Sequence, residues 1–496
     1  MQKKQTILVV ASLLVVVLSV TLAYFTAQII GKGKNVTINS ADLKIIFTDS
    51  DGSISGTNIE PGKWNVTKTF TIENKSNETY KYNIVIQDLV NTFVTNGYLQ
   101  YKITSTNGGY NMTEFKDVPK SETATDTILA YSVSISVGVT QSYTVEFKYA
   151  NDESVDQSND MGKKLSGTLF ITEGTEDPNK TLYNQLLVDK STKLTRTDFS
   201  KVLTDNNTNT LYTGVEDSKT VYYFAGNATD NWVKFGKNAS NQDLYWRIIR
   251  TNSDGSVRLL YHGTSTTTTD AYIGTSAFNS SYDNIAYVSY MYGSLGSISS
   301  ARENTNNSTI KTTIDNWYIS NLEAKGYTKY LSTTAVYCND RSISSDSINF
   351  GAFTRLGTNK TPSYDCAATE DKFTVDTSTG NGKLTYPIAL MTADEVSFAG
   401  GLYGANTPTW YYYNSVNGSS TGSKFWWLLS PLDSSTSGSS MFIVRGSSNP
   451  GRLNYNYVYS NNGVRPALSL KSCVKYSSGD GSANEPYTIK ETETGC

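Results

Sequence analysis

The sequence predicts an all-β sandwich followed by an α+β domain. From residue 36 to 173, short runs of alternating apolar and polar residues are separated by Gly, Asn, Asp and Pro, which is the pattern of antiparallel strands. After an acidic, Pro-containing stretch, EGTEDPNK, strand and helix patterns are mixed. The chain has 496 residues, more than a single hydrophobic core usually serves, so we expect two folded units.

The first 34 residues have the pattern of a segment that leaves the cytoplasm. Lys3 and Lys4 precede a largely apolar run from Ile7 to Phe25 that contains no charged residue. This pattern is typical of a secretory signal peptide, with Ala23 at a suitable cleavage position, and the run is also long enough for a membrane anchor, which needs about 20 residues. Both alternatives stay open, and in either case the positive charges place everything after Lys34 outside the cell.

The predicted sandwich covers residues 35–174. Its clearest strands are expected at 41–49, 67–76, 80–89, 99–106, 142–150 and 164–173. Turns are expected at IEPGKW and TNGGYN, where Gly can adopt the positive φ of a tight turn.

Residues 175–221 are predicted to be a linker with short helical segments, which begin at Thr181 and extend through DFSKVLTDN. The second domain, 222–472, contains a hairpin turned at 253–255. Its main helix begins after the N-cap Ser308, has an apolar stripe and stops at Gly326. The stripe consists of Ile310, Ile314, Trp317 and Leu322. A second helix begins at a capping box formed by Thr392 and Glu395.

The cysteines predict structural disulfides in an oxidising compartment. Their spacing favours Cys338 with Cys366 and Cys473 with Cys496, although three pairings are formally open. The second pair would close a tail at 473–496. With one histidine and no CxxC spacing, we expect no metal and no cofactor. A net charge of -3 without a basic run argues against nucleic acid as a partner.

Catalytic patterns are weak, so the sequence predicts a protein that is not an enzyme. His262 follows an apolar strand and is expected to be structural. Asp394 and Glu395 are explained by their position at a helix start. GxSxG, HExxH and phosphate-loop patterns are absent from the required contexts. A pair of glycosidase carboxylates stays open as an alternative.

A binding surface is expected between the apolar segments FWWLLSP and GVRPALSL. Residues 433–463 are dominated by Ser, Asn, Gly and Tyr, a mixture that binding loops present on rigid scaffolds. Arg465, which lies between apolar residues, is expected to be a hydrogen-bonded structural residue. The predicted ligand-binding residues are Trp410, Tyr412, Ser447, Arg452, Asn454, Tyr455, Asn456, Tyr457, Tyr459, Asn461 and Asn462.

The leader ends in SVTLAYFTAQ and is followed by strands that include ADLKIIFTD and DQSNDMGKKLSGTLFI. In these segments the chain resembles the camelysin and TasA-like proteins of Gram-positive bacteria, which coat the surface or build biofilm matrix. The resemblance implies a jelly-roll-like sandwich. It also implies self-assembly in which residues 35–39 would be the strand donated to a neighbouring subunit.

A second resemblance rests on LYWRIIRTNSDGSVRLLYHG, STIKTTIDNWY, LTYPIALMTADEVSFAGG, FWWLLSP and GVRPALSLKS, which occur in this order. In these blocks the chain is similar to an uncharacterised C-terminal module of Gram-positive surface proteins, itself similar to the formylglycine-generating-enzyme and C-type-lectin fold. The resemblance implies that the blocks form the core and that 433–463 is the ligand face. The paired active-site cysteines, the multiple histidines and the calcium signatures of the catalytic and calcium-binding relatives do not match this sequence.

Together these features predict a bacterial cell-surface protein, secreted or membrane-tethered through an uncleaved leader. It would bind an extracellular glycan or protein ligand through a C-type-lectin-like module on a β-sandwich stalk, as an adhesin does. The alternative is a structural biofilm-matrix protein that forms fibres through its sandwich.

Overall fold

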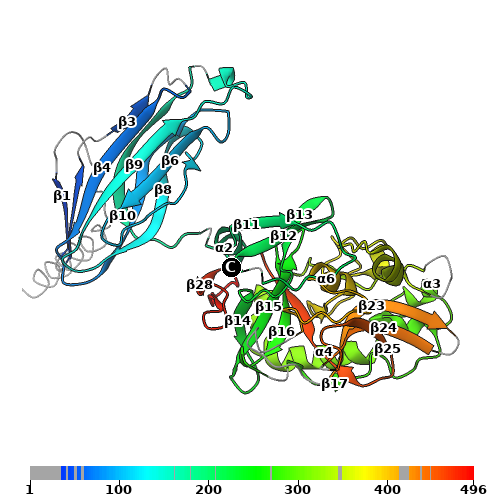
Figure 1. The fold of residues 1–496 in the computed structure, drawn as a ribbon. Helices are drawn as coiled ribbons and strands as arrows, with labels where there is room; N and C mark the ends of the chain where they lie inside the picture. Colours follow the sequence, from blue (N-terminus) through cyan, green and yellow to red (C-terminus); the bar gives the residue numbers. More distant parts are fainter. Residues whose placement is uncertain are drawn as a thin grey trace, which may run out of the picture. The chain divides into compact units, whose positions relative to one another are not determined.

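The computed structural model describes residues 35–40, 43–49, 53–56, 61–160, 162–178, 180–206, 208–268, 271–343, 349–412, 424–435, 438–446 and 448–496, the stretches before residue 57 by backbone alone. The fold is mostly β, and the chain divides into two compact units after Pro178 (Figure 1). Among the described residues, no helix is both long and apolar enough to cross a membrane.

The first unit contains two antiparallel sheets. One sheet has the order β1 (Asn35–Ser40), β2 (Leu43–Asp49), β4 (Asn65–Asn74), β9 (Thr140–Tyr149), β6 (Leu99–Ser105) and β7 (Lys116–Asp117). The other has the order β3 (Ser53–Gly56), β10 (Leu165–Glu173), β5 (Tyr80–Asn91) and β8 (Ser121–Ile135). The six predicted strands are therefore present.

Alternation of buried and more exposed side chains along the strands explains how the two sheets pack. In β4 and β9 every second side chain is buried, and Phe70 stacks on Tyr143 with ring centroids 4.8 Å apart. Buried side chains of both sheets form one hydrophobic core. Strand β8 was not predicted, because its first half, Ser121 to Asp126, is polar and largely exposed.

A larger, branched sheet forms the framework of the second unit. Its path runs β11 (Thr192–Thr195), β12 (Thr210–Glu216), β13 (Lys219–Tyr223), β15 (Asp243–Thr251), β14 (Trp232–Lys237), β29 (Tyr487–Ile489) and β28 (Tyr476–Ser478). Strand β15 also pairs with β16 (Val257–Gly263), which pairs with β27 (Pro466–Leu470), and β27 pairs with β22 (Ile388–Leu390). Because β27 lies between two strands and is buried along its whole length, none of its side chains faces solvent.

A second sheet carries the predicted binding segment. Its order is β17 (Thr275–Ser276), β26 (Asn462–Gly463), β23 (Trp426–Ser435), β24 (Gly438–Val444) and β25 (Leu453–Tyr457). Strands β23, β24 and β25, drawn in orange, lie side by side in Figure 1. Two short ladders join β18 (Met291–Tyr292) to β19 (Asn306–Asn307) and β20 (Tyr337–Cys338) to β21 (Lys372–Phe373).

The helices begin where their caps predict. Ser308 accepts from the Lys311 N–H at the start of α4 (Thr309–Tyr318), and Gly326 has a φ of 76° beyond the helical turns that follow. Thr392 and Glu395 form the expected capping box of α6 (Ala393–Phe398). The remaining α-helices of the described residues are α2 (Leu182–Asp189), α3 (Ile298–Ala301) and α5 (Gly351–Phe353).

Two predicted boundaries are wrong. The helical segment after Thr181 ends at Asp189, and the chain continues into β11, β12 and β13, so the expected linker contributes three strands to the sheet of the second unit. The expected tail after Cys473 likewise supplies β28 and β29 to that sheet. Short strands with mixed polarity contribute to a sheet through backbone hydrogen bonds, which leave little trace in a hydrophobic pattern.

Both predicted disulfides are present. Cys338 pairs with Cys366 and Cys473 with Cys496, over sequence separations of 28 and 23 residues.

Candidate ligand-binding site

Strand β25 presents two of the predicted tyrosines to solvent. It lies at the edge of its sheet, with Tyr455 opposite Phe442 and Tyr457 opposite Ser440 on β24. Tyr455 is 39% exposed and Tyr457 is 46% exposed, whereas Leu453 at the start of the strand is buried. The side chains at positions 455 and 457 extend from the same face of this strand, because they are two residues apart.

Three rings come together at the end of this strand. Tyr459 lies nearly parallel to Tyr457, with centroids 5.7 Å apart and 8° between the planes. The Tyr282 ring, 44% exposed, lies 4.9 Å from Tyr459 at an angle of 56°. We call Tyr282, Tyr455, Tyr457 and Tyr459 the tyrosine face. Sequence reasoning missed Tyr282, which precedes Asp283 in a polar segment far from the others in the chain.

A glycine on the neighbouring strand leaves room for one of these rings. A Cβ atom at Gly438 would lie 3.0 Å from Cε1 of Tyr457, closer than an ordinary van der Waals contact. The absence of a side chain at Gly438 therefore lets the Tyr457 ring lie across the hairpin of β24 and β25.

The predicted asparagines mainly hold the turn after β25. Nδ2 of Asn456 donates to Oδ1 of Asn462 at 3.3 Å, and Oγ of Ser460 donates to Oδ1 of Asn456 at 3.1 Å. Asn462 is buried, Asn454 is half-buried, and Asn461 is exposed. The amides of Asn456 and Asn462 thus fix the turn that carries Tyr459, and Asn461 is the exposed one among the predicted asparagines.

Two predicted site residues lie in the core instead. Trp410 is fully buried and donates from Nε1 to the Phe224 carbonyl at 3.0 Å, and Tyr412 is 6% exposed. The expectation that these rings face solvent is wrong, because Trp410, Tyr411 and Tyr412 belong to the hydrophobic core of the second unit. Arg452 is half-buried, and Ser447 lies outside the described residues.

Arg465 is a structural residue, as expected. The fully buried guanidinium group donates from Nε and Nη2 to the Tyr261 carbonyl, at 3.2 and 3.0 Å, and from Nη1 to the Tyr411 carbonyl at 2.7 Å. It also lies 4.6 Å from the centre of the Trp426 ring. His262 is buried as well, and burial with the nearby Arg247 and Arg465 lowers its pKa well below 6.5.

A buried cluster of charged residues lies in the second unit. Oε1 of Glu395 accepts from Arg250 at 2.9 Å and from Arg258 at 2.7 Å, and Arg250 also pairs with Glu216 at 2.7 Å. Burial acts to raise the pKa of the Glu395 carboxyl, but Arg258 and Arg250 outweigh it and leave the pKa lowered. We call these four residues the charge cluster.

The cavity beside the charge cluster is small. Its volume is about 20 Å³, and it is also lined by Asp340, Arg355 and Asp394. Arg355 pairs with Asp340 at 2.6 Å and with Asp394 at 3.0 Å. A volume of this size holds about one water molecule. Arginines pair with these carboxylates, so the arrangement stabilises buried charge and has no room for a substrate.

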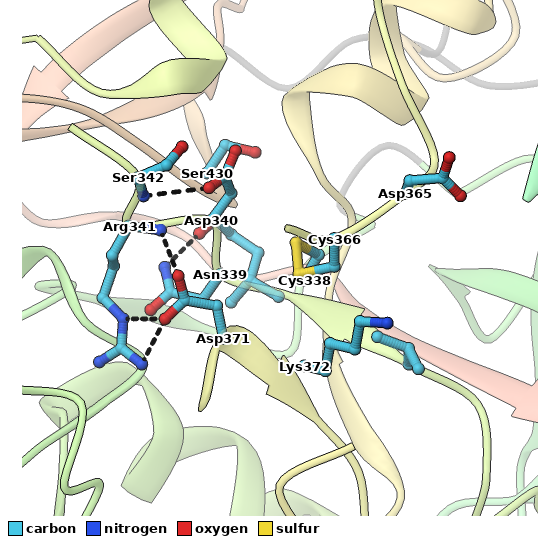
Figure 2. The surroundings of a disulfide bond; sticks show 12 residues. Cys338, Asn339, Asp340, Arg341, Ser342, Asp365, Cys366, Asp371, Lys372 and Ser430 are labelled. Carbon is cyan, nitrogen blue, oxygen red and sulfur yellow. Dashed lines mark hydrogen bonds and ion pairs between the residues drawn. A yellow bond between two sulfur atoms is a disulfide. The ribbon is translucent and has the colours of Figure 1, made fainter. Parts of the chain in front are cut away.

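A second ion-pair group lies near the Cys338–Cys366 disulfide. Figure 2 shows the side chain and backbone nitrogen of Arg341 directed at the carboxylate of Asp371, with contacts of 2.8 and 2.9 Å. Arg302 donates to the same carboxylate at 2.7 Å. Within the described ranges, no group of three or more His, Cys, Asp or Glu side chains is placed to hold a metal ion.

No protein-family model, curated protein or solved structure matches this chain.

Proposed function

We propose that this chain is an extracellular bacterial surface protein that binds a glycan or protein ligand through the tyrosine face. The observation that carries the proposal is the exposure of the four rings, which ranges from 39% for Tyr455 to 49% for Tyr459. Tyrosine rings offer a large amphipathic contact area at low entropy cost, stack on the apolar faces of sugars and fill pockets of proteins. The proposal assigns no catalytic role and no cofactor to the chain.

The fold that we propose for the second unit is C-type-lectin-like, and the first unit would be a jelly-roll-like sandwich that acts as its stalk. The two disulfides support an extracellular location, since disulfides persist in oxidising compartments. The expected signal peptide or anchor lies outside the described residues. Attachment to the membrane through that segment is part of the proposal.

The test removes the rings and keeps the scaffold. We expect Tyr455→Ala combined with Tyr457→Ala to abolish binding on arrays of glycans and extracellular proteins, without a change in the melting temperature. Tyr245→Ala is the matched control, because Tyr245 is a partly exposed tyrosine on β15 in the large sheet of the same unit. Retained binding by the double variant, or equal loss in the control, would contradict the proposal.

A fibre-forming matrix protein is the second candidate. Strand β1 supports it, because among the described strands β1 lies at one edge of the six-stranded sheet, next to β2. The open edge of such a strand is a template for another chain. Electron microscopy of the chain with and without the residues before Ile38 separates the candidates, since only the matrix protein forms fibres and loses them on truncation.

A further inference from the structure

The hairpin between β24 and β25 carries one arginine at each end. Arg445 follows Val444, the last residue of β24, and Arg452 precedes Leu453, the first residue of β25. The N–H of Arg445 donates to the carbonyl of Arg452 at 2.9 Å, next to the pair formed by Val444 and Leu453. Residues directly opposite each other on antiparallel strands extend from the same face of the sheet. We call Arg445 and Arg452 the arginine pair.

These two guanidinium groups have few partners in the part of the chain that the structure describes. The Arg445 side chain donates no hydrogen bond there, and Arg452 donates one, from Nη1 to Oδ1 of Asn449 at 3.2 Å. The Nε atoms of both are shielded from solvent without an acceptor. Neither arginine forms an ion pair with a described carboxylate.

The other arginines of the second unit are different. Each donates at least two side-chain hydrogen bonds to described residues, as Arg250, Arg341 and Arg355 do to carboxylates. Among the described residues of the second unit, the arginines whose side chains donate fewer than two hydrogen bonds are therefore Arg445 and Arg452.

The sequence segments around the two arginines add positive charge and contain no acid. The sequence contains no Asp or Glu between Asp433 and Asp480, and none between Ala405 and Trp427. The exposed Lys424 precedes Phe425, and the Arg445 guanidinium lies over the Phe425 ring at 4.8 Å. A cation held on an aromatic ring keeps its position while its donors stay available.

This arrangement costs stability in the free protein. Like charges at directly opposite positions of two strands repel each other, and guanidinium donors shielded from water without an acceptor lose hydrogen-bond energy. An oxyanion beside the two side chains would offset both costs, because the planar fork of arginine matches carboxylate, sulfate and phosphate groups with two parallel hydrogen bonds.

We propose that the arginine pair is an oxyanion-binding site that takes a carboxylate, sulfate or phosphate group of a ligand. Arg445 and Arg452 supply the charge and the donors, and Phe425 positions Arg445. The side chain of Asn449 orients Arg452 through the hydrogen bond to its Nη1. The site does not depend on the tyrosine face, so the two can fail separately.

Calorimetric titration of the full chain at low ionic strength tests the site. The probes are inorganic phosphate, sulfate and glucuronate, with glucose as the neutral control. We expect saturable binding of at least one anion and none of glucose. Comparison of the glucuronate and phosphate arms then tells whether a sugar carboxylate or a phosphate is preferred. If none of the three anions saturates, or if glucose binds equally well, the proposal is overturned.

Variants assign any binding to the arginine pair. Arg445→Gln with Arg452→Gln should weaken the affinity at least tenfold, whereas Lys325→Gln with Lys329→Gln, which removes the same charge from an exposed segment, should leave it within twofold. Arg445→Lys with Arg452→Lys keeps the charge and loses the planar fork, so an intermediate loss is expected. This variant decides the question if the glutamine variant does not fold, and wild-type affinity in either arginine variant excludes the site.

Discussion

The rings of Tyr457 and Tyr459 lie almost parallel, 5.7 Å apart between centroids, and each is nearly half exposed. Tyr457 belongs to β25 and Tyr459 to the turn after it, so the turn geometry sets this arrangement. Buried Asn462 and half-buried Asn456 hold that turn by the hydrogen bond between their side chains. The side chains of Asn456 and Asn462 therefore help to position Tyr459 in the ligand face that we propose.

Stability should separate the predicted site residues that face solvent from those that do not. Trp410→Ala should lower the free energy of unfolding by about 3–5 kcal/mol, because a fully buried ring leaves a cavity. Tyr457→Ala should change it by less than about 1 kcal/mol, since the ring is 46% exposed. Urea denaturation of both variants checks this difference. Equal losses would mean that Tyr457 is part of the core.

Glu395 should make the second unit sensitive to acid. Its folded-state pKa lies below 4.5, because Arg258 and Arg250 outweigh the effect of burial. The ionised carboxylate therefore contributes stability above its unfolded-state pKa, and this contribution is lost as the pH falls through the folded-state pKa. Glu395→Gln leaves two buried guanidinium groups less compensated and should cost about 3–5 kcal/mol at neutral pH.

Urea denaturation from neutral to acidic pH measures this effect. The stability of the wild type should fall more steeply with acid than that of Glu395→Gln. Parallel pH profiles of the two proteins would show that the charge cluster does not contribute to acid sensitivity.

Gly451 should be needed for the conformation of the loop between β24 and β25, which carries the arginine pair. Its φ is 66°, and a Cβ atom there would lie 1.9 Å from the Thr407 carbonyl oxygen, so Gly451→Ala combines backbone strain with a collision against backbone. Gly326→Ala is the matched control, because its φ is 76° and no atom lies within 4 Å of the added Cβ. We expect the first variant to lower the melting temperature clearly more than the second.

The Cys338–Cys366 disulfide should stabilise the second unit. Replacing both cysteines with Ala frees a loop with a sequence separation of 28 residues and should cost about 2–4 kcal/mol through the entropy of the unfolded chain. Reductant should lower the melting temperature of the wild type further than that of this variant, which keeps only the Cys473–Cys496 bond. An unchanged melting temperature in the variant would contradict this role.

Local chemistry made part of the fold and site predictable. The caps at Ser308 and Thr392 and the structural role of Arg465 depend on neighbours in sequence or on the rule that buried polar groups need partners. The strands of the first unit were predictable because one face of each is buried, which imposes alternation. Polar strands such as β8 and β11 have no such pattern, because backbone pairing alone places them.

The sequence did not allow us to predict which aromatic residues are exposed. Trp410 and Tyr457 stand in similar polar segments rich in tyrosine, yet one is in the core and the other at the surface. Tyr282 contacts Tyr459, from which it is separated by more than a third of the sequence. The lack of an acceptor for Nε of Arg445 and Arg452 likewise depends on which side chains the fold brings close to them.

The sequence by itself determined the two-unit β-rich organisation and the helix starts, and it favoured the observed cysteine pairs, because these follow from periodicity, caps and spacing within short segments. Only the tertiary structure decided which tyrosines meet at the surface and which arginines have few hydrogen-bond partners, because burial and charge pairing depend on residues brought together from distant parts of the chain.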